Sequence, residues 1–413
     1  MRVAAARTFR SLESFNYRMW AAGAIVSNVG TWMGRTAQDW LVLTGLTHGN
    51  AAAVGVVMAL QSGPQLLLLP LTGLAADRLD RRRLLLATQA AMAVLSLALG
   101  VLTTTGLVRL WHVDALAFLS GCAAAFDAPA RQTFVAELVG EADLANAVAL
   151  NSTSFNAARM IGPALAGLLI AAVGAGWLFL VNAASFGAVL CSLCLLRSGE
   201  LHPGGGARAT PGGLAAGVRT LRRRPELRAV LLMVFLIGTF GLNFPIFISA
   251  MAVRAFHAGS GRYGLLTSAM AVGSVAGALL AAGRRPRLGV LTAGSAAFGL
   301  AFAVAAVMPD AWLFGAALVV LGVAAQTVTT TAISLVQLGT EPALRGRVVA
   351  ILLAIALGGT PLGAPAIGWV ADRFGPRWAM GIGAASGLAA AIVGLCHLVR
   401  AGRELRTPLG AKP

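Results

Sequence analysis

One charged stretch separates two long apolar segments near the start of this chain: Gly73-Leu-Ala-Ala-Asp77-Arg78-Leu-Asp80-Arg81-Arg82-Arg83. Each flanking segment is long enough to cross the roughly 30 Å hydrocarbon core of a bilayer as a helix. Charges this dense can lie between two such helices only as a loop at the membrane surface. Because arginine collects in cytoplasmic loops, the stretch predicts a chain that leaves the membrane on the cytoplasmic side and turns back.

The composition indicates a membrane protein. Of the 413 residues, 58 % are hydrophobic and 11 % are charged, and the mean hydropathy is +0.80. A soluble domain carries about 25 % charged residues. The net charge of +17 does not indicate a nucleic-acid partner, because the arginines lie in short loops between apolar runs. The cysteines lie in or beside apolar runs, so we expect neither a metal site nor a cofactor.

Apolar runs of about 20 residues, the length that spans a bilayer, recur twelve times. They lack the alternation of a β-strand, which predicts an all-α polytopic fold of twelve transmembrane helices. The predicted spans are residues 18–44, 51–74, 84–106, 111–130, 144–174, 177–197, 227–250, 263–283, 288–308, 311–336, 347–371 and 377–399.

The distribution of Lys and Arg predicts the orientation. With a cytoplasmic N-terminus, twenty-five of the 32 basic residues fall in cytoplasmic segments and five in periplasmic ones. The other two, Arg35 and Arg159, fall inside helices. This bias places both termini in the cytoplasm and the protein in the bacterial inner membrane.

A cytoplasmic linker divides the chain near its middle. Residues 198–226 contain a glycine-rich run and then a basic stretch that reads as a helix lying on the anionic leaflet. The linker separates one six-helix half, residues 1–197, from a second, residues 227–413, which ends in a short cytoplasmic tail. Duplication is also indicated by an internal repeat: Gly167, Gly174 and Trp177 recur 201 positions later as Gly368, Gly375 and Trp378.

The first helix carries four polar or aromatic residues on one face. Asn28, Trp32, Arg35 and Asp39 are spaced at i, i+4, i+7 and i+11. Arg35 and Asp39 are one turn apart and can form a structural ion pair. The alternative is that the stripe lines a central cavity, in which Asp39 takes up and releases a proton.

The fifth helix has a similar face, formed by Ser152, Asn156, Arg159 and Pro163. Arg159 lies near the middle of the membrane, where a guanidinium needs a carboxylate, carbonyls, water or an anionic ligand. We expect Asn156 and Arg159 to belong to the substrate or proton pathway, with pairing inside the bundle as the alternative.

Glycine and proline remove bulk from this same helix. Gly162, Pro163 and Gly167 allow a close helix approach, and Pro163 leaves a backbone carbonyl free. Gly363 and Pro365 repeat the theme in the eleventh helix. The pattern suits a hinge for rocking motion, and it equally suits ordinary small-residue packing.

Several stretches together resemble a known family, the major facilitator superfamily of transporters. They are 73–83, Phe126-Asp-Ala-Pro-Ala-Arg131, Ala145-Asn-Ala-Val-Ala-Leu-Asn151, Asn156-x-x-Arg159-x-x-Gly162-Pro163 and Arg345-Gly-Arg347. The similarity is greatest to the branch of bacterial effluxers that contains the enterobactin exporter.

The resemblance implies two six-helix halves and a loop after the second helix that steadies one state of the transport cycle. In this chain Asp80 replaces the glycine usual in that loop, which affects its turn but not its ionic contacts. The residues to which we assign conformational gating are Gly73, Asp77, Arg78, Arg82, Arg83, Asp127, Arg131, Gly162, Pro163 and Gly167.

The leading functional hypothesis is proton-coupled export of a small amphipathic or anionic compound, such as a siderophore, drug or metabolite. Uptake of a nutrient is a second hypothesis, and a polytopic membrane enzyme is a third. The enzyme hypothesis lacks support, because the five histidines are scattered and no pair has catalytic spacing. The expected partners are a small-molecule substrate, protons and membrane lipids, and we expect a monomer.

Overall fold

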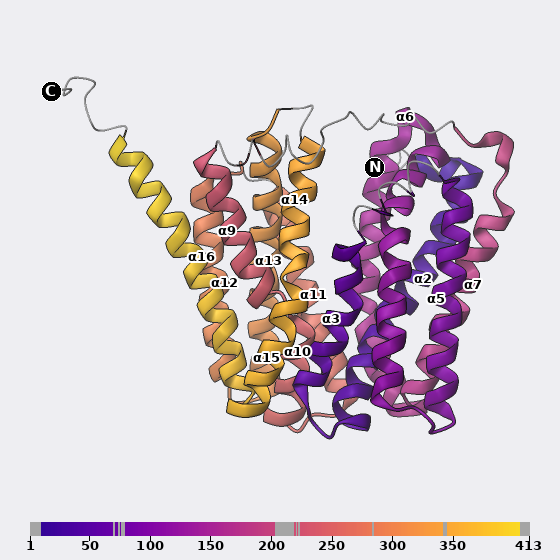
Figure 1. The fold of residues 1–413 in the computed structure, drawn as a ribbon, viewed down its shortest axis with the longest axis horizontal. Coiled ribbons are helices and arrows are strands. Elements are labelled where there is room, and N and C mark those ends of the chain that lie inside the picture. The colour runs from indigo at the N-terminus through magenta and orange to yellow at the C-terminus, as the bar shows by residue number, and fades with distance from the viewer. Residues whose placement is uncertain are drawn as a thin grey trace, which may run out of the picture. The chain divides into compact units, whose positions relative to one another are not determined.

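The computed structural model describes residues 10–68, 71, 72, 75, 79–202, 219, 221, 224–282, 285–341 and 345–404. Throughout these residues the chain forms helices with short 3-10 and π turns, and no strand occurs among them (Figure 1). The prediction of an all-helical protein is therefore confirmed. The glycine-rich part of the predicted linker, residues 203–218, and most of its basic stretch lie outside the described residues.

The chain forms two compact units. The first comprises Met1–Arg208 together with His257–Ser268, and the second comprises Ala209–Phe256 and Ala269–Pro413. Helix α11 (Ser260–Ala282) is thus divided, because its first two turns pack with the first unit.

The helices of the first unit are α2 (Phe15–Trp40), α3 (Ala51–Leu67), α5 (Arg81–Thr104), α6 (Leu110–Val173) and α7 (Ala175–Leu195). Those of the second unit are α9 (Pro225–Phe240), α10 (Phe244–Ala250), α12 (Leu288–Val307), α13 (Ala311–Leu338), α14 (Arg345–Gly358), α15 (Thr360–Phe374) and α16 (Pro376–Glu404), with the rest of α11. Short 3-10 turns lie at Arg10–Glu13 and Ser198–Glu200.

Ten helical stretches of the described chain are long and apolar enough to cross a membrane. Helix α3 is apolar but shorter, and α2 has 26 residues that include the predicted polar stripe. The protein is therefore a multi-pass membrane protein.

The bounds of helix α6 differ from the predicted spans 111–130 and 144–174. The structure shows helices Leu110–Gly140 and Asp143–Val173, which meet at a kink where Gly140 has φ 70° and ψ −179°. The first extends past the predicted span because Phe134, Val135 and Leu138 form an apolar stripe that packs in a core with Tyr17 of α2. The backbone at Gly140 is accessible essentially to glycine alone, so the chain can turn there without leaving the core.

Two π turns repeat in the two halves of the sequence. Helix α2 runs into the π turn Leu41–Leu46 and is followed by His48 at φ 52°. Helix α10 runs into the π turn Met251–Ala255 and is followed by His257 at φ 49°. The repeat shows in backbone conformation rather than in residue identity, so the sequence did not reveal it.

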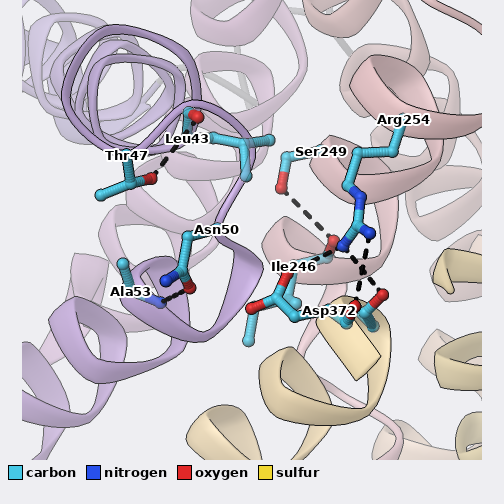
Figure 2. Close-up of polar contacts among 9 residues, drawn as sticks. Leu43, Thr47, Asn50, Ala53, Ile246, Ser249, Arg254 and Asp372 are labelled. Atoms are coloured by element: carbon cyan, nitrogen blue, oxygen red, sulfur yellow. Dashed lines mark hydrogen bonds and ion pairs between the residues drawn. The ribbon is translucent and has the colours of Figure 1, made fainter. Parts of the chain in front are cut away.

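Residues in or next to these two π turns form polar contacts with nearby carbonyl and carboxylate groups (Figure 2). In the first turn, the Thr47 hydroxyl donates hydrogen bonds to the carbonyls of Val42 at 2.6 Å and Leu43 at 3.5 Å. In the second unit, Arg254 donates to the Asp372 carboxylate and to the Ala371 carbonyl, each at 2.9 Å. Arg254 therefore neutralises the carbonyl end of α15.

Candidate functional site

The Trp32 ring of α2 is the centre of the candidate site. The guanidinium carbon of Arg35 lies 5.4 Å from the centre of this ring, and that of Arg159 from α6 lies 5.7 Å away. Phe155 meets the ring edge-on at 5.7 Å. An indole face attracts cations at such distances, so Trp32 gathers two positive charges within the first unit.

A glycine permits this approach of α6 to α2. A Cβ atom at Gly162 would lie 2.6 Å from the Cβ of Trp32 and 3.2 Å from the Val29 carbonyl. Any larger residue would push the two helices apart. The glycine thus fixes the distance between Arg159 and the Trp32 ring.

The predicted ion pair between Arg35 and Asp39 is not formed. The ion pairs within 4 Å among the described residues are Arg10–Asp143, Arg81–Glu137, Arg131–Asp127, Arg197–Glu200 and Arg254–Asp372. Helical side chains lean toward the N-terminus, which carries Arg35 back onto Trp32 and away from Asp39 in the following turn. Spacing alone had placed the pair within reach.

Asp39 instead accepts a hydrogen bond from Tyr263 of α11. The Tyr263 hydroxyl lies 3.4 Å from Oδ2 of Asp39, and the Tyr263 ring stacks on Trp40 at 5.8 Å. Both partners are buried: Asp39 is 9 % exposed and Tyr263 is 1 % exposed. Sequence reasoning missed Tyr263, although the scarcity of tyrosine, two in the whole chain, was a usable signal.

Close packing of α6 on the start of α11 holds Tyr263 in place. A Cβ at Gly167 would lie 2.6 Å from the Ser260 carbonyl, and one at Gly264 would overlap the Pro163 carbonyl. One turn further along, the Ser268 hydroxyl donates to the Met160 carbonyl at 2.7 Å. The predicted small-residue face of α6 is therefore a seam against α11 as well as α2.

The two asparagines of the predicted pathway form no hydrogen bond with an arginine among the described residues. Asn28 is buried in α2, 8 % exposed. The Asn156 amide donates to the Ser152 carbonyl of its own helix at 2.9 Å.

Two further carboxylates, Asp114 and Asp127, lie in a helix that is long and apolar enough to cross a membrane, Leu110–Gly140. Asp127, 6 % exposed in α6, pairs with Arg131 at 2.9 Å and accepts hydrogen bonds from Thr88 at 3.0 Å and Gln89 at 2.6 Å. Asp114, near the start of α6, has a buried oxygen that accepts no hydrogen bond from any residue in the described ranges. Asp127 was assigned to conformational gating, whereas Asp114 was not singled out, because a carboxylate near the end of an apolar run is expected to belong to a loop.

Of the charged loop, Gly73, Asp77 and Arg78 lie outside the described residues. Asp80 caps α5 by accepting a hydrogen bond from the Arg83 amide at 2.7 Å, a physical role for the residue that departs from the family pattern. Arg81 pairs with Glu137 of α6. Arg82 donates to the Leu193 carbonyl at 2.9 Å and so caps the end of α7.

Metal ligation has no support in the part of the chain that the structure describes, where no three His, Cys, Asp or Glu side chains gather. The site therefore offers chemistry of two kinds: guanidinium and indole groups that can bind a ligand, and a buried carboxylate that can hold a proton.

The sequence profile of one family, described as transmembrane secretion effector within the major facilitator superfamily, matches residues 7–408. The chain belongs to this family. The predicted membership in the superfamily is thereby confirmed.

Curated relatives of this family member cover most of its length. It is 27 % identical to the staphyloferrin A transporter of Staphylococcus aureus, over 84 % of this chain and 87 % of the relative. It is 28 % identical to the multidrug efflux pump Tap of Mycolicibacterium fortuitum, over 85 % and 88 % of the two chains. It is 27 % identical to the enterobactin exporter EntS of Citrobacter koseri, over 88 % and 87 %.

Solved structures agree on the fold. A mutant of the nucleoside transporter NupG aligns with a TM-score of 0.74 at 14 % identity, over 92 % of this chain and 99 % of the other. An inward-facing bacterial homologue of the lysosomal transporter Spinster aligns with a TM-score of 0.70 at 15 % identity, over 92 % and 95 %. The protein is a major facilitator transporter of small molecules, and the enzyme hypothesis is set aside.

Proposed function

We propose that this transporter exports small amphipathic or anionic compounds across the bacterial inner membrane in exchange for protons. Both termini lie in the cytoplasm, and two six-helix halves rock about the substrate to expose it to either side in turn. The observation that carries the proposal is the pair of guanidinium groups over Trp32. Two relatives, named an efflux pump and an exporter, support the direction.

The arginines favour an anionic substrate. A guanidinium at the centre of a bilayer costs about 2.5–3.5 kcal/mol on insertion scales unless a partner compensates it. In the described part of the chain neither Arg35 nor Arg159 has a carboxylate within 4 Å. An anion in transit would supply that partner, and the Trp32 and Phe155 rings would receive its apolar part.

Asp39 is the group that we assign to the proton. As a carboxylate it accepts the hydrogen bond from Tyr263 and so ties α2 to the start of α11. A hydrogen bond to an ionised acceptor is about twice as strong as one to a neutral acceptor, so protonation weakens this tie. Proton occupancy would thus bias the conformational cycle, and the substrate need not touch Asp39 for the two to be coupled.

Transport by purified protein in proteoliposomes tests the proposal. An imposed pH gradient should drive export of an anionic dye such as carboxyfluorescein by the wild type. Asp39→Asn should abolish the response to the gradient while downhill exchange of the dye persists. Asp114→Asn is the matched control, since it neutralises another carboxylate of a candidate membrane span, one that forms no hydrogen bond with α11 among the described residues. Unchanged pH-driven export by Asp39→Asn would refute the coupling role.

A further inference from the structure

A cavity of about 80 Å³ lies in the first unit, lined by residues of α2, α3, α5, α6 and α7. Its wall is apolar where Leu95, Phe179 and Phe186 face it. A single water needs only about 10–15 Å³ of such space, so the cavity holds several waters or one small group of atoms. It is distinct from the contact between Asp39 and Tyr263, neither of which lines it.

One wall of the cavity is strongly polar. Thr31, Arg35 and Gln38 line it from α2, where their spacing of i, i+4 and i+7 places them on one face. Gln61 contributes a second amide from α3. None of the lining residues is acidic, so the only full charge at the wall is the positive charge of Arg35.

Some polar groups that line the cavity have hydrogen-bond partners in the protein, and others do not. On α5 and α7, the Asn182 amide donates to the Ser96 hydroxyl at 3.1 Å, and this hydroxyl donates to the Phe179 carbonyl at 2.9 Å. Arg35, Gln38 and Gln61 form no side-chain hydrogen bond with any residue that the structure describes. Arg35 is nevertheless exposed within the bundle, because its guanidinium faces this space. Arg35, Gln38 and Gln61 therefore bring hydrogen-bond donors from two helices to a volume whose lining contains no carboxylate.

We infer that this cavity is a subsite for a carboxylate group, formed by Arg35 with Gln38 and Gln61. A carboxylate matches the guanidinium fork with two parallel hydrogen bonds, which a spherical anion such as chloride cannot do. The contact with Trp32 at 5.4 Å restrains the Arg35 guanidinium, so less freedom is lost on binding. The inference rests on the proposed function, and it narrows the exported class to compounds that carry a carboxylate.

The size of the cavity sets what enters it. Sites for whole drug-sized ligands occupy about 300–1,000 Å³, several times this volume. Only the carboxylate end of a larger compound fits, and its remainder must lie outside the cavity. The side-chain amides of Gln38 and Gln61 then add selectivity for a carboxylate, since each amide N–H can donate to a carboxylate lone pair that the guanidinium leaves free.

Binding of propionate to the full-length protein in detergent tests the inference. The midpoint of thermal unfolding is followed as sodium propionate is titrated against sodium chloride at equal ionic strength. Propionate should raise the midpoint in the wild type and in Arg18→Gln, a control arginine exposed on the same helix. In Arg35→Gln the apparent dissociation constant should rise at least about tenfold, and Arg35→Lys should give a smaller increase. Gln61→Leu, on another helix, should also weaken binding and remains informative if Arg35→Gln does not fold.

Two results would overturn the carboxylate subsite. One is an equal stabilisation by chloride and propionate, which would show a general anion effect. The other is a propionate response that persists undiminished in Arg35→Gln, or in Gln61→Leu if the arginine variant is unfolded. Because binding is measured without transport, propionate binding with no proton-driven export would refute the proposed function alone. Export without specific propionate binding would refute the subsite alone.

Discussion

The Tyr263 hydroxyl lies 3.4 Å from Oδ2 of Asp39 and so joins two residues that are 224 positions apart in the chain. The contact is long for an O–H···O hydrogen bond, whose usual length is about 2.7–2.8 Å. Most of the stability at this point must therefore come from the Tyr263 ring, which is buried and stacked on Trp40. The hydroxyl and the ring can be separated by substitution.

Tyr263→Phe should leave the fold almost intact but impair coupling. Loss of a long hydrogen bond removes about 1 kcal/mol or less, so the thermal midpoint in detergent should fall only slightly. Tyr263→Ala also removes a buried aromatic ring, which typically costs about 3–5 kcal/mol. If the hydroxyl tie belongs to the proton cycle, Tyr263→Phe should reduce pH-driven export several-fold. If Tyr263→Phe exports at the wild-type rate, the hydrogen bond between Tyr263 and Asp39 has no role in coupling, and Tyr263 contributes only packing.

Hydropathy predicted the membrane class and most helix positions because a span must be long and apolar whatever surrounds it. The predicted ends were wrong where tertiary packing extends a helix beyond the predicted span, as at Phe134 and Leu138 of α6. The sequence alone does not predict such an extension, because the same apolar residues could equally belong to a loop that packs against the helix bundle.

The candidate site was predicted in part. Helical spacing placed Trp32 and Arg35 on one face and singled out Arg159, and the structure brings these three together. Spacing failed for Asp39, because the direction in which a helical side chain leans decides between neighbours one turn away. Tyr263 could not be found from spacing at all, since its contact depends on how α11 packs against α2.

The glycine seam gives a prediction for substitutions by alanine. At Gly167 a new Cβ would lie 2.6 Å from a backbone carbonyl, which cannot move aside. Gly167→Ala should therefore destabilise the protein by about 1–3 kcal/mol, the usual range for overpacking. Gly187→Ala in α7 is the control, because its Cβ meets nothing within 4 Å. It should be neutral or stabilising by up to about 1 kcal/mol. Equal thermal midpoints for the two variants would show that α6 and α11 can move apart at Gly167 without loss of stability.

Arg82 and Arg83 were both assigned to gating, and the structure distinguishes them. Arg82 donates to the Leu193 and Cys194 carbonyls and to the Ser198 hydroxyl, whereas Arg83 is exposed. Arg82→Gln should lower the free energy of unfolding by about 1 kcal/mol, because the last carbonyls of α7 lose a charged donor. Arg83→Gln should change it little. Thermal midpoints and export rates should be measured for both variants. Loss of export at unchanged stability in Arg82→Gln would indicate that Arg82 acts in conformational gating rather than as a helix cap.

His48 and His257 give a paired prediction, because each adopts a positive φ after a π turn. A side chain in this left-handed region costs about 1–2 kcal/mol, a penalty that glycine does not incur. His48→Gly and His257→Gly should therefore raise the thermal midpoint or leave it unchanged, while valine at either position should lower it. His397→Gly is the control, because His397 lies in α16, where glycine costs about 1 kcal/mol in an ordinary helix. If the two turns serve as hinges that must leave the left-handed conformation during transport, the stabilised glycine variants should also export more slowly. A lower midpoint in both glycine variants would mean that the imidazoles make contacts worth more than the strain.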